Sequence, residues 1–131
     1  MISREDLENF FDRLGAEGVQ SREVEPDLWV LTTGDDGPEV VVHYNPPVAV
    51  LRVRVMKLPD KAKRLEFFRH LLELNASDLA HGSYGVAGED VVLSDALELE
   101  NLDFNEFQAS FDSMTIALAS HLSTFAPFRT A

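Results

Sequence analysis

Apolar residues recur at helical spacing near the start of the chain. The residues that repeat at steps of three and four positions are Leu7, Phe10, Phe11 and Leu14. This spacing puts them on one face of an α-helix. Ser3, with Asp6 three positions later, is typical of a pair that caps the first turn, and Gly15 is a typical end. The pattern predicts a short first helix with one apolar face.

Three β-rich segments follow this helix. Residues 28–33 and 39–44 are joined by residues 34–38 (GDDGP), a sequence typical of a hairpin turn. A third segment, about 48–55, alternates leucine and valine with two arginines. Alternation with a period of two places apolar side chains on one face of a strand and polar ones on the other. We therefore expect a sheet that is buried on one face and wetter on the other.

A second helix is predicted from Asp60, a residue suited to the N-cap, to about residue 74. Its apolar residues are Leu65, Phe67, Phe68, Leu71, Leu72 and Leu74. On a helical wheel they cover about 180°, more than the stripe of a little over 100° that packs against one sheet. Either the core encloses this helix or part of its apolar surface meets a second subunit. A fold of two layers favours the interface, with Phe68, Leu71 and Leu72 as its residues.

The glycine-rich residues 81–88 precede two further β-rich segments, 91–93 and 97–99, which predict a second hairpin. After them, Asp103 with Glu106 is typical of a helix start, and Leu102 can pack against Phe107 as a hydrophobic staple. The apolar stripe of this third helix continues until Pro127 and comprises Phe104, Phe107, Phe111, Met114, Leu118, Leu122 and Phe125.

The order of these elements, α-β-β-β-α-β-β-α, predicts the fold class. Consecutive strands with short turns pair in an antiparallel way, so we expect an α+β fold with a five-stranded, mainly antiparallel sheet and three helices. The narrow stripes of the first and third helices predict that both cover one face of the sheet. A chain of 131 residues has room for one core, so residues 1–131 are expected to form a single domain.

The composition and net charge of the chain limit the classes of molecule that it is expected to bind. The chain is 45% hydrophobic and 26% charged, as in ordinary globular proteins, and carries a formal charge of -12. Such an acidic chain disfavours direct contact with nucleic acid and favours a partner protein that presents a basic segment, with Glu98 and Glu100 as candidate contact residues. The chain shows no signal peptide or membrane span, so we expect a cytoplasmic protein that does not bind membranes.

The sequence offers no support for catalysis. It contains no cysteine, and its four histidines, His43, His70, His81 and His121, lie on different elements without metal-ligand spacing. His121 lies at the rim of the third helix's stripe, where a partly buried structural role is expected. The three glycines at 82, 85 and 88 do not have the context of a phosphate-binding loop and are interpreted as turn residues. We therefore expect no catalytic, metal-binding or cofactor-binding residues.

Four segments resemble a known group of proteins. Residues 71–75 (LLELN), 84–86 (YGV), 90–93 (DVVL) and 97–103 (LELENLD) resemble the YbjN-like proteins and the related class I type III secretion chaperones. The resemblance covers about residues 60–125 by motif and the first half by element order. It implies a small acidic α+β protein, usually a homodimer, that binds a segment of another protein and is not an enzyme.

The leading hypothesis is thus a dimeric binding protein, either chaperone-like or an adaptor in stress response or regulation. Two alternatives stay open, a small enzyme of unknown activity and a structural subunit of a larger complex. Membership of the YbjN-like branch would imply a regulatory or stress-linked adaptor rather than a role in secretion.

Overall fold

The computed structural model describes residues 1–129. Its helices are α1 (Arg4–Gly15), α2 (Arg64–Ser77) and α3 (Phe104–Phe125), with two short 3₁₀ turns, η1 (Lys61–Lys63) and η2 (Ala126–Phe128). Its strands are β1 (Val19–Glu25), β2 (Leu28–Thr33), β3 (Glu39–Asn45), β4 (Val48–Lys57), β5 (Ser83–Ala87) and β6 (Asp90–Glu98).

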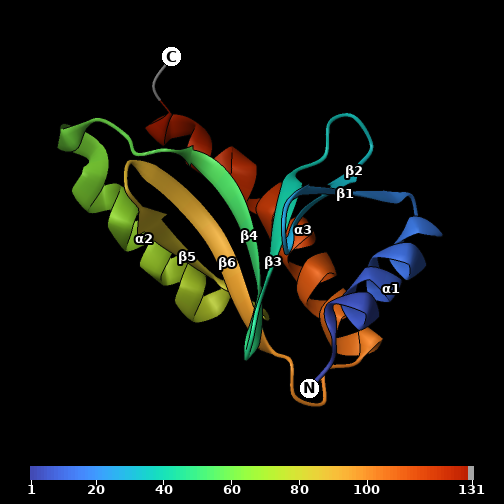
Figure 1. Ribbon diagram of the computed structural model, residues 1–131. Coiled ribbons are helices and arrows are strands. Elements are labelled where there is room, and N and C mark those ends of the chain that lie inside the picture. Colours follow the sequence, from blue (N-terminus) through green and yellow to red (C-terminus); the bar gives the residue numbers. More distant parts are fainter. Residues whose placement is uncertain (130–131) are drawn as a thin grey trace.

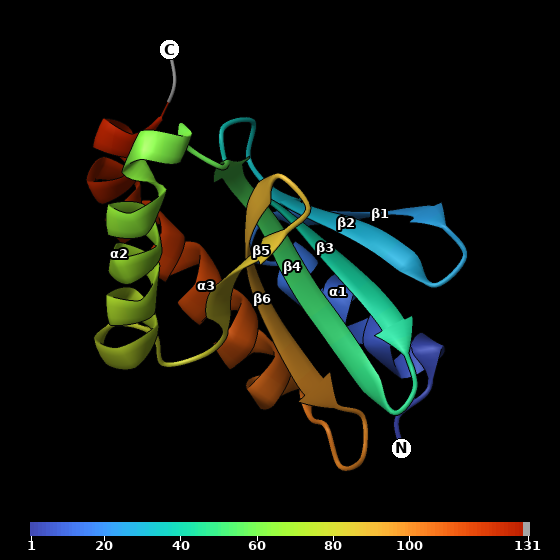
Figure 2. The same cartoon turned by 90° about the vertical axis from the view of Figure 1, so that its left-hand side faces the viewer.

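All strands join one antiparallel sheet in the order β1-β2-β3-β4-β6-β5. Helices α1 and α3 lie on one face of this sheet, while α2 stands at its β5 side (Figure 1). Figure 2 views the sheet from the side of α2, with the strands passing in front of α1. The α+β class, the antiparallel sheet and the placement of α1 and α3 on one face are confirmed.

The sheet has six strands instead of the expected five, because β1 was not predicted. This strand pairs with β2 from Val19↔Thr33 onward and forms one edge of the sheet. Val19 is its only buried residue, and the six that follow are exposed. A strand that buries one side chain has no apolar alternation, so its sequence looks like a polar linker. The observed order is therefore α-β-β-β-β-α-β-β-α.

The second hairpin also differs from the prediction. The segments 91–93 and 97–99 were expected to be separate strands, but residues 90–98 form the single strand β6. Its partner β5 comes from the glycine-rich stretch, and Gly85 lies within that strand rather than in a turn. Gly88 does form the turn, with φ of 62°, a conformation that other residues rarely adopt. A glycine inside a strand has no side chain to signal β structure.

The third helix begins where the sequence predicts. The Asp103 carboxylate accepts a hydrogen bond of 2.8 Å from the backbone N–H of Glu106. One side of α3 is buried along its whole length, and the residues on this side are Phe104, Phe107, Ser110, Phe111, Met114, Leu118, His121 and Phe125. Leu122, which was expected in this stripe, is 42% exposed, and His121 is 6% exposed in its place. The buried stripe of α3 joins the first half of the fold to the second.

Asn75 connects α2 to the edge of the sheet. Its amide oxygen accepts a hydrogen bond of 2.7 Å from the backbone N–H of Tyr84, and its amide nitrogen donates one of 3.1 Å to the Tyr84 carbonyl. Tyr84 lies on β5, the last strand on this side of the sheet. The asparagine therefore satisfies backbone groups that a neighbouring strand would otherwise take. This contact explains a polar residue at the end of the LLELN segment.

We predict that Asn75→Ala destabilises the fold. It leaves the N–H and C=O of Tyr84 without their partner in a half-buried position, which costs about 1–3 kcal/mol in the free energy of unfolding. Urea denaturation measures the loss, with Asn105→Ala at an exposed position of α3 as the matched control. Equal stability of the two variants would contradict this role for Asn75.

Candidate partner-binding surfaces

Helix α2 has two apolar stripes, which explains its wide apolar arc. The inner stripe consists of Phe67, Leu71 and Leu74, which are all buried. The Phe67 ring lies 6.1 Å from that of Phe125 and 5.1 Å from that of Phe128, measured between ring centroids. These contacts fasten α2 to the end of α3. The inner stripe therefore belongs to the chain's own core.

The outer stripe consists of Leu65, Phe68 and Leu72, spaced at steps of three and four residues along α2. Their exposed fractions are 85%, 36% and 67%. Phe68 and Leu72 were predicted as interface residues and are accessible. Leu71, the third predicted residue, is only 4% exposed, because it faces the core, so it is not part of this surface. Leu65 takes its place, and its spacing to Phe68 and Leu72 was the signal in the sequence.

The two predicted contact residues for a basic partner lie near one end of β6. Glu98 ends that strand opposite Val48 of β4 and is exposed. Glu100 lies beyond the strand, and its carboxylate is 3.3 Å from the amino group of Met1. The structure thus places both carboxylates on the surface, although only Glu98 is a strand residue.

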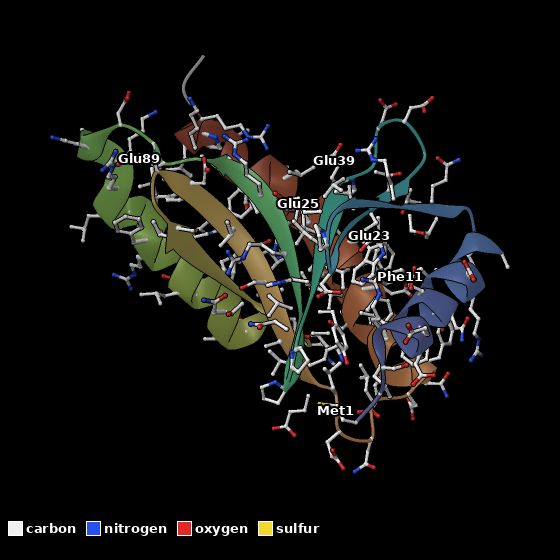
Figure 3. All side chains as sticks on the ribbon, in the orientation of Figure 1. Met1, Phe11, Glu23, Glu25, Glu39 and Glu89 are labelled. Atoms are coloured by element: carbon white, nitrogen blue, oxygen red, sulfur yellow. The ribbon has the colours of Figure 1, made fainter. Side chains whose placement is uncertain are left out.

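Charge is unevenly distributed over the molecule. Seven of the eleven basic residues lie between residues 52 and 69: Arg52, Arg54, Lys57, Lys61, Lys63, Arg64 and Arg69. Three of these seven form ion pairs, with Asp90, Glu89 and Glu73. In contrast, Glu23 and Glu25 of β1 and Glu39 of β3 lie apart from α2 (Figure 3), and Glu23 is paired with Arg4. Of the 23 acidic residues, 21 lie outside residues 52–69, both before and after this basic segment in the sequence.

A buried polar cluster joins α3 to β5. The Tyr84 hydroxyl and Nδ1 of His121 share a hydrogen bond of 2.7 Å, and Nε2 of His121 lies 3.5 Å from a carboxylate oxygen of Asp78. Burial raises the pKa of the Tyr84 hydroxyl. A buried phenol with a raised pKa stays protonated at neutral pH and is a poor nucleophile. The cluster therefore serves packing, in keeping with the structural role expected for His121.

The other histidines do not gather into a site. His70 shares a hydrogen bond of 2.8 Å with Thr124 and stacks on Phe128, so it reinforces the contact of α2 with the end of α3. Among residues 1–129, no group of three or more histidine or carboxylate side chains is placed to hold a metal ion. None of the helices in this part of the chain combines the length and apolarity needed to cross a membrane.

Comparison with known proteins identifies the fold. The CesT_Tir_1 family model matches residues 3–130. A chain of the heterodimeric ExoU–SpcU complex from the type III secretion system of Pseudomonas aeruginosa is 16% identical over 91% of this chain and 97% of that chain, with a TM-score of 0.71. YbjN from E. coli is 14% identical over 94% and 93%, with a TM-score of 0.66.

A third similar structure is a chain of the Yersinia pestis type III secretion chaperone SycH in complex with a fragment of YscM2. It is 15% identical over 88% of this chain and 96% of that chain, with a TM-score of 0.57. No curated protein matches the sequence. The structural matches confirm the resemblance to YbjN-like proteins and class I type III secretion chaperones.

The buried phenol predicts how stability depends on alkaline pH. Because the pKa of Tyr84 is raised in the folded state, the unfolded chain loses this proton first, above a pH of about 10. The stabilisation is complete below that pH and is lost as pH rises, by about 1.4 kcal/mol per pH unit.

Urea denaturation at pH values between about 8.5 and 11 tests this. The free energy of unfolding should fall less steeply with pH in Tyr84→Phe than in the unchanged protein. Tyr44→Phe, which retains Tyr84, should keep the steeper fall. Identical slopes for Tyr84→Phe and the unchanged protein would show that Tyr84 does not contribute.

Proposed function

Because the chain belongs to the CesT_Tir_1 family, we propose that it forms a homodimer that binds a segment of a partner protein as a chaperone or adaptor. The family consists of chaperones, which bind other proteins and are not enzymes. Two of the similar structures are complexes with other proteins, ExoU–SpcU and SycH with YscM2. We propose that the chain works as a single cytoplasmic domain without a cofactor. Its similarity to YbjN keeps a regulatory or stress-linked adaptor within the proposal.

The observation that carries the proposal is the outer stripe of α2. A monomer leaves Leu65 and Leu72 largely in water, at 85% and 67% exposure. Fully burying a side chain of this kind contributes about 1.5–3 kcal/mol. A two-fold axis through the middle of α2 doubles the number of buried side chains, because each copy presents the same stripe to the other. Arg69, already paired with Glu73 on this helix, suits the polar rim of such an interface.

The proposed partner presents a basic segment. The chain carries a charge of -12, and most of its basic residues are confined to residues 52–69. The rest of the surface, including Glu98 and Glu100, attracts cationic side chains and repels nucleic acid and anionic membranes. Any effect on nucleic acid is then indirect, through a partner that itself binds it. Charge of this kind raises the rate of association more than the final affinity.

Light scattering coupled to size-exclusion chromatography tests the homodimer. We expect the unchanged protein to have twice the mass of one chain. The variants Phe68→Glu and Leu72→Glu should each have the mass of a single chain, because burying a carboxylate in the interface is too costly for the two stripes to pack together. Ile116→Glu is the matched control, since Ile116 is 66% exposed on α3. Circular dichroism checks that each variant is folded. A folded monomer without substitution would contradict the dimer.

The charge of the partner is tested by the salt dependence of binding. After affinity purification and mass spectrometry identify a stoichiometric partner, surface plasmon resonance compares about 50 mM and about 500 mM salt, where the screening length falls from about 14 Å to about 4 Å. We expect the association rate constant to fall at least several-fold and the dissociation rate constant to change less. An unchanged association rate, or an acidic partner surface, would argue against a basic segment.

A further inference from the structure

The sheet splits between β3 and β4 at one end. These strands pair from Asn45↔Val48 to Val41↔Arg52. Beyond Arg52, β4 continues to Lys57 and pairs only with β6, while the first residues of β3 pair only with β2. Figure 1 shows the two strands diverging at this end, with α3 behind the opening. On its β3 side, residues 53–57 of β4 therefore have no partner strand among residues 1–129.

A groove of about 630 Å³ occupies this split. Its apolar lining comes mainly from β4 and α3 and includes Val53, Val55, Leu118 and Leu122. Leu122 is the residue that the sequence placed in the core but that the structure leaves 42% exposed. Because the sheet opens above it, part of the α3 surface that continuous strands would cover faces the groove instead.

The wall on the β3 side is a tight turn. Gly37 and Pro38 line the groove, and a Cβ atom at Gly37 would lie 2.2 Å from the carbonyl oxygen of Thr33. Only glycine fits this close approach of the turn to the end of β2. Proline has no backbone N–H to donate to a strand at this point. The turn therefore offers no proline N–H to an edge strand at the start of β3.

The rim of the groove is acidic. Asp36 and Glu39 line it and are exposed, and within residues 1–129 neither forms an ion pair. Arg54, the cationic residue of the lining, is already paired with Asp90 at 3.1 Å. An occupant thus meets an apolar floor, two carboxylates and a strand edge. These features suit an extended segment with apolar side chains on one side and basic ones on the other.

We propose that this groove binds such an extended segment of the partner protein, with an apolar side chain against Leu122 and Val55 and a lysine or arginine beside Asp36 and Glu39. The proposal rests on the proposed partner-binding function and adds the place and the chemistry. A volume of this size holds a small ligand or a few side chains, so a peptide segment fits better than the flat face of a second copy. No residue of α2 lines the groove, so dimerisation through the outer stripe leaves it open.

Binding of two labelled synthetic peptides, followed by fluorescence anisotropy, tests the proposal. One decapeptide alternates valine with lysine, and the other alternates valine with glutamate. The lysine peptide should bind saturably to the unchanged protein and the glutamate peptide should not. Leu122→Asn and Glu39→Gln should each weaken binding at least fivefold. Hydrogen exchange should slow at residues 39–41 and 53–57 when the lysine peptide is bound.

The matched controls are Ile116→Asn and Glu106→Gln, an exposed apolar residue and an exposed glutamate of α3 outside the groove. Both should bind the lysine peptide as the unchanged protein does. Equal binding of the two peptides, no saturable binding, or equal weakening by a control would overturn the proposal. So would a loss of oligomer mass in Leu122→Asn, which would show a second copy in the groove. If the natural partner still binds Leu122→Asn with full affinity, the groove is not its binding site, although the proposed partner-binding function is unaffected.

Discussion

The whole fold depends on the single apolar stripe of α3. Near its start, the Phe107 ring lies 5.8 Å from the rings of both Phe10 and Phe11 of α1. Near its end, the Phe125 ring lies 6.1 Å from Phe67 of α2 and 5.4 Å from Tyr84 of β5. One helix thus contacts α1 from the start of the chain and α2 and β5 from its middle. Since α3 and β5 cover only the inner stripe of α2, the outer stripe remains in water.

The two outer edges of the sheet beneath α3 are protected against pairing with further strands, whereas the split between β3 and β4 leaves a strand edge unpaired within residues 1–129. At the β5 edge, Asn75 occupies backbone groups of Tyr84. At the opposite edge, β1 carries charged residues such as Arg22 and Glu23, which disfavour pairing of this edge with other sheets. Between β3 and β4 the ladder stops at Val41↔Arg52, with a groove beside it. The proposed partner segment and the proposed second copy would therefore bind at separate places.

The sequence predicts those elements whose signals are local. The capping pair of Ser3 and Asp6 is present as reciprocal hydrogen bonds of 2.9 and 3.2 Å, and α3 begins after Asp103 as expected. Strand β1 escaped prediction because an edge strand that packs little apolar surface has no apolar periodicity. Gly85 concealed β5 for a related reason, since a glycine lacks the side chain that signals a strand.

Assigning side chains to the core or the surface needed the tertiary structure. The apolar arc of α2 showed that the helix has surplus apolar surface, but only the position of α3 and β5 determines that Leu71 is buried and Leu65 exposed. Similarly, His121 is buried and shares a hydrogen bond with Tyr84, while Leu122 faces the split in the sheet. The groove itself could not be predicted, because it depends on where the ladder between β3 and β4 ends.

The central claim is that one stripe of α2 belongs to the fold and the other to a second copy of the chain. The sequence contains no cysteine, so Ala76→Cys gives a single spin-labelling site at the exposed end of α2. Pulsed dipolar spectroscopy on this variant measures the distance between the labels of two chains. Helices packed about 8–10 Å apart through this stripe predict one distance population between about 20 and 40 Å. Absence of dipolar coupling in the folded protein would contradict the account.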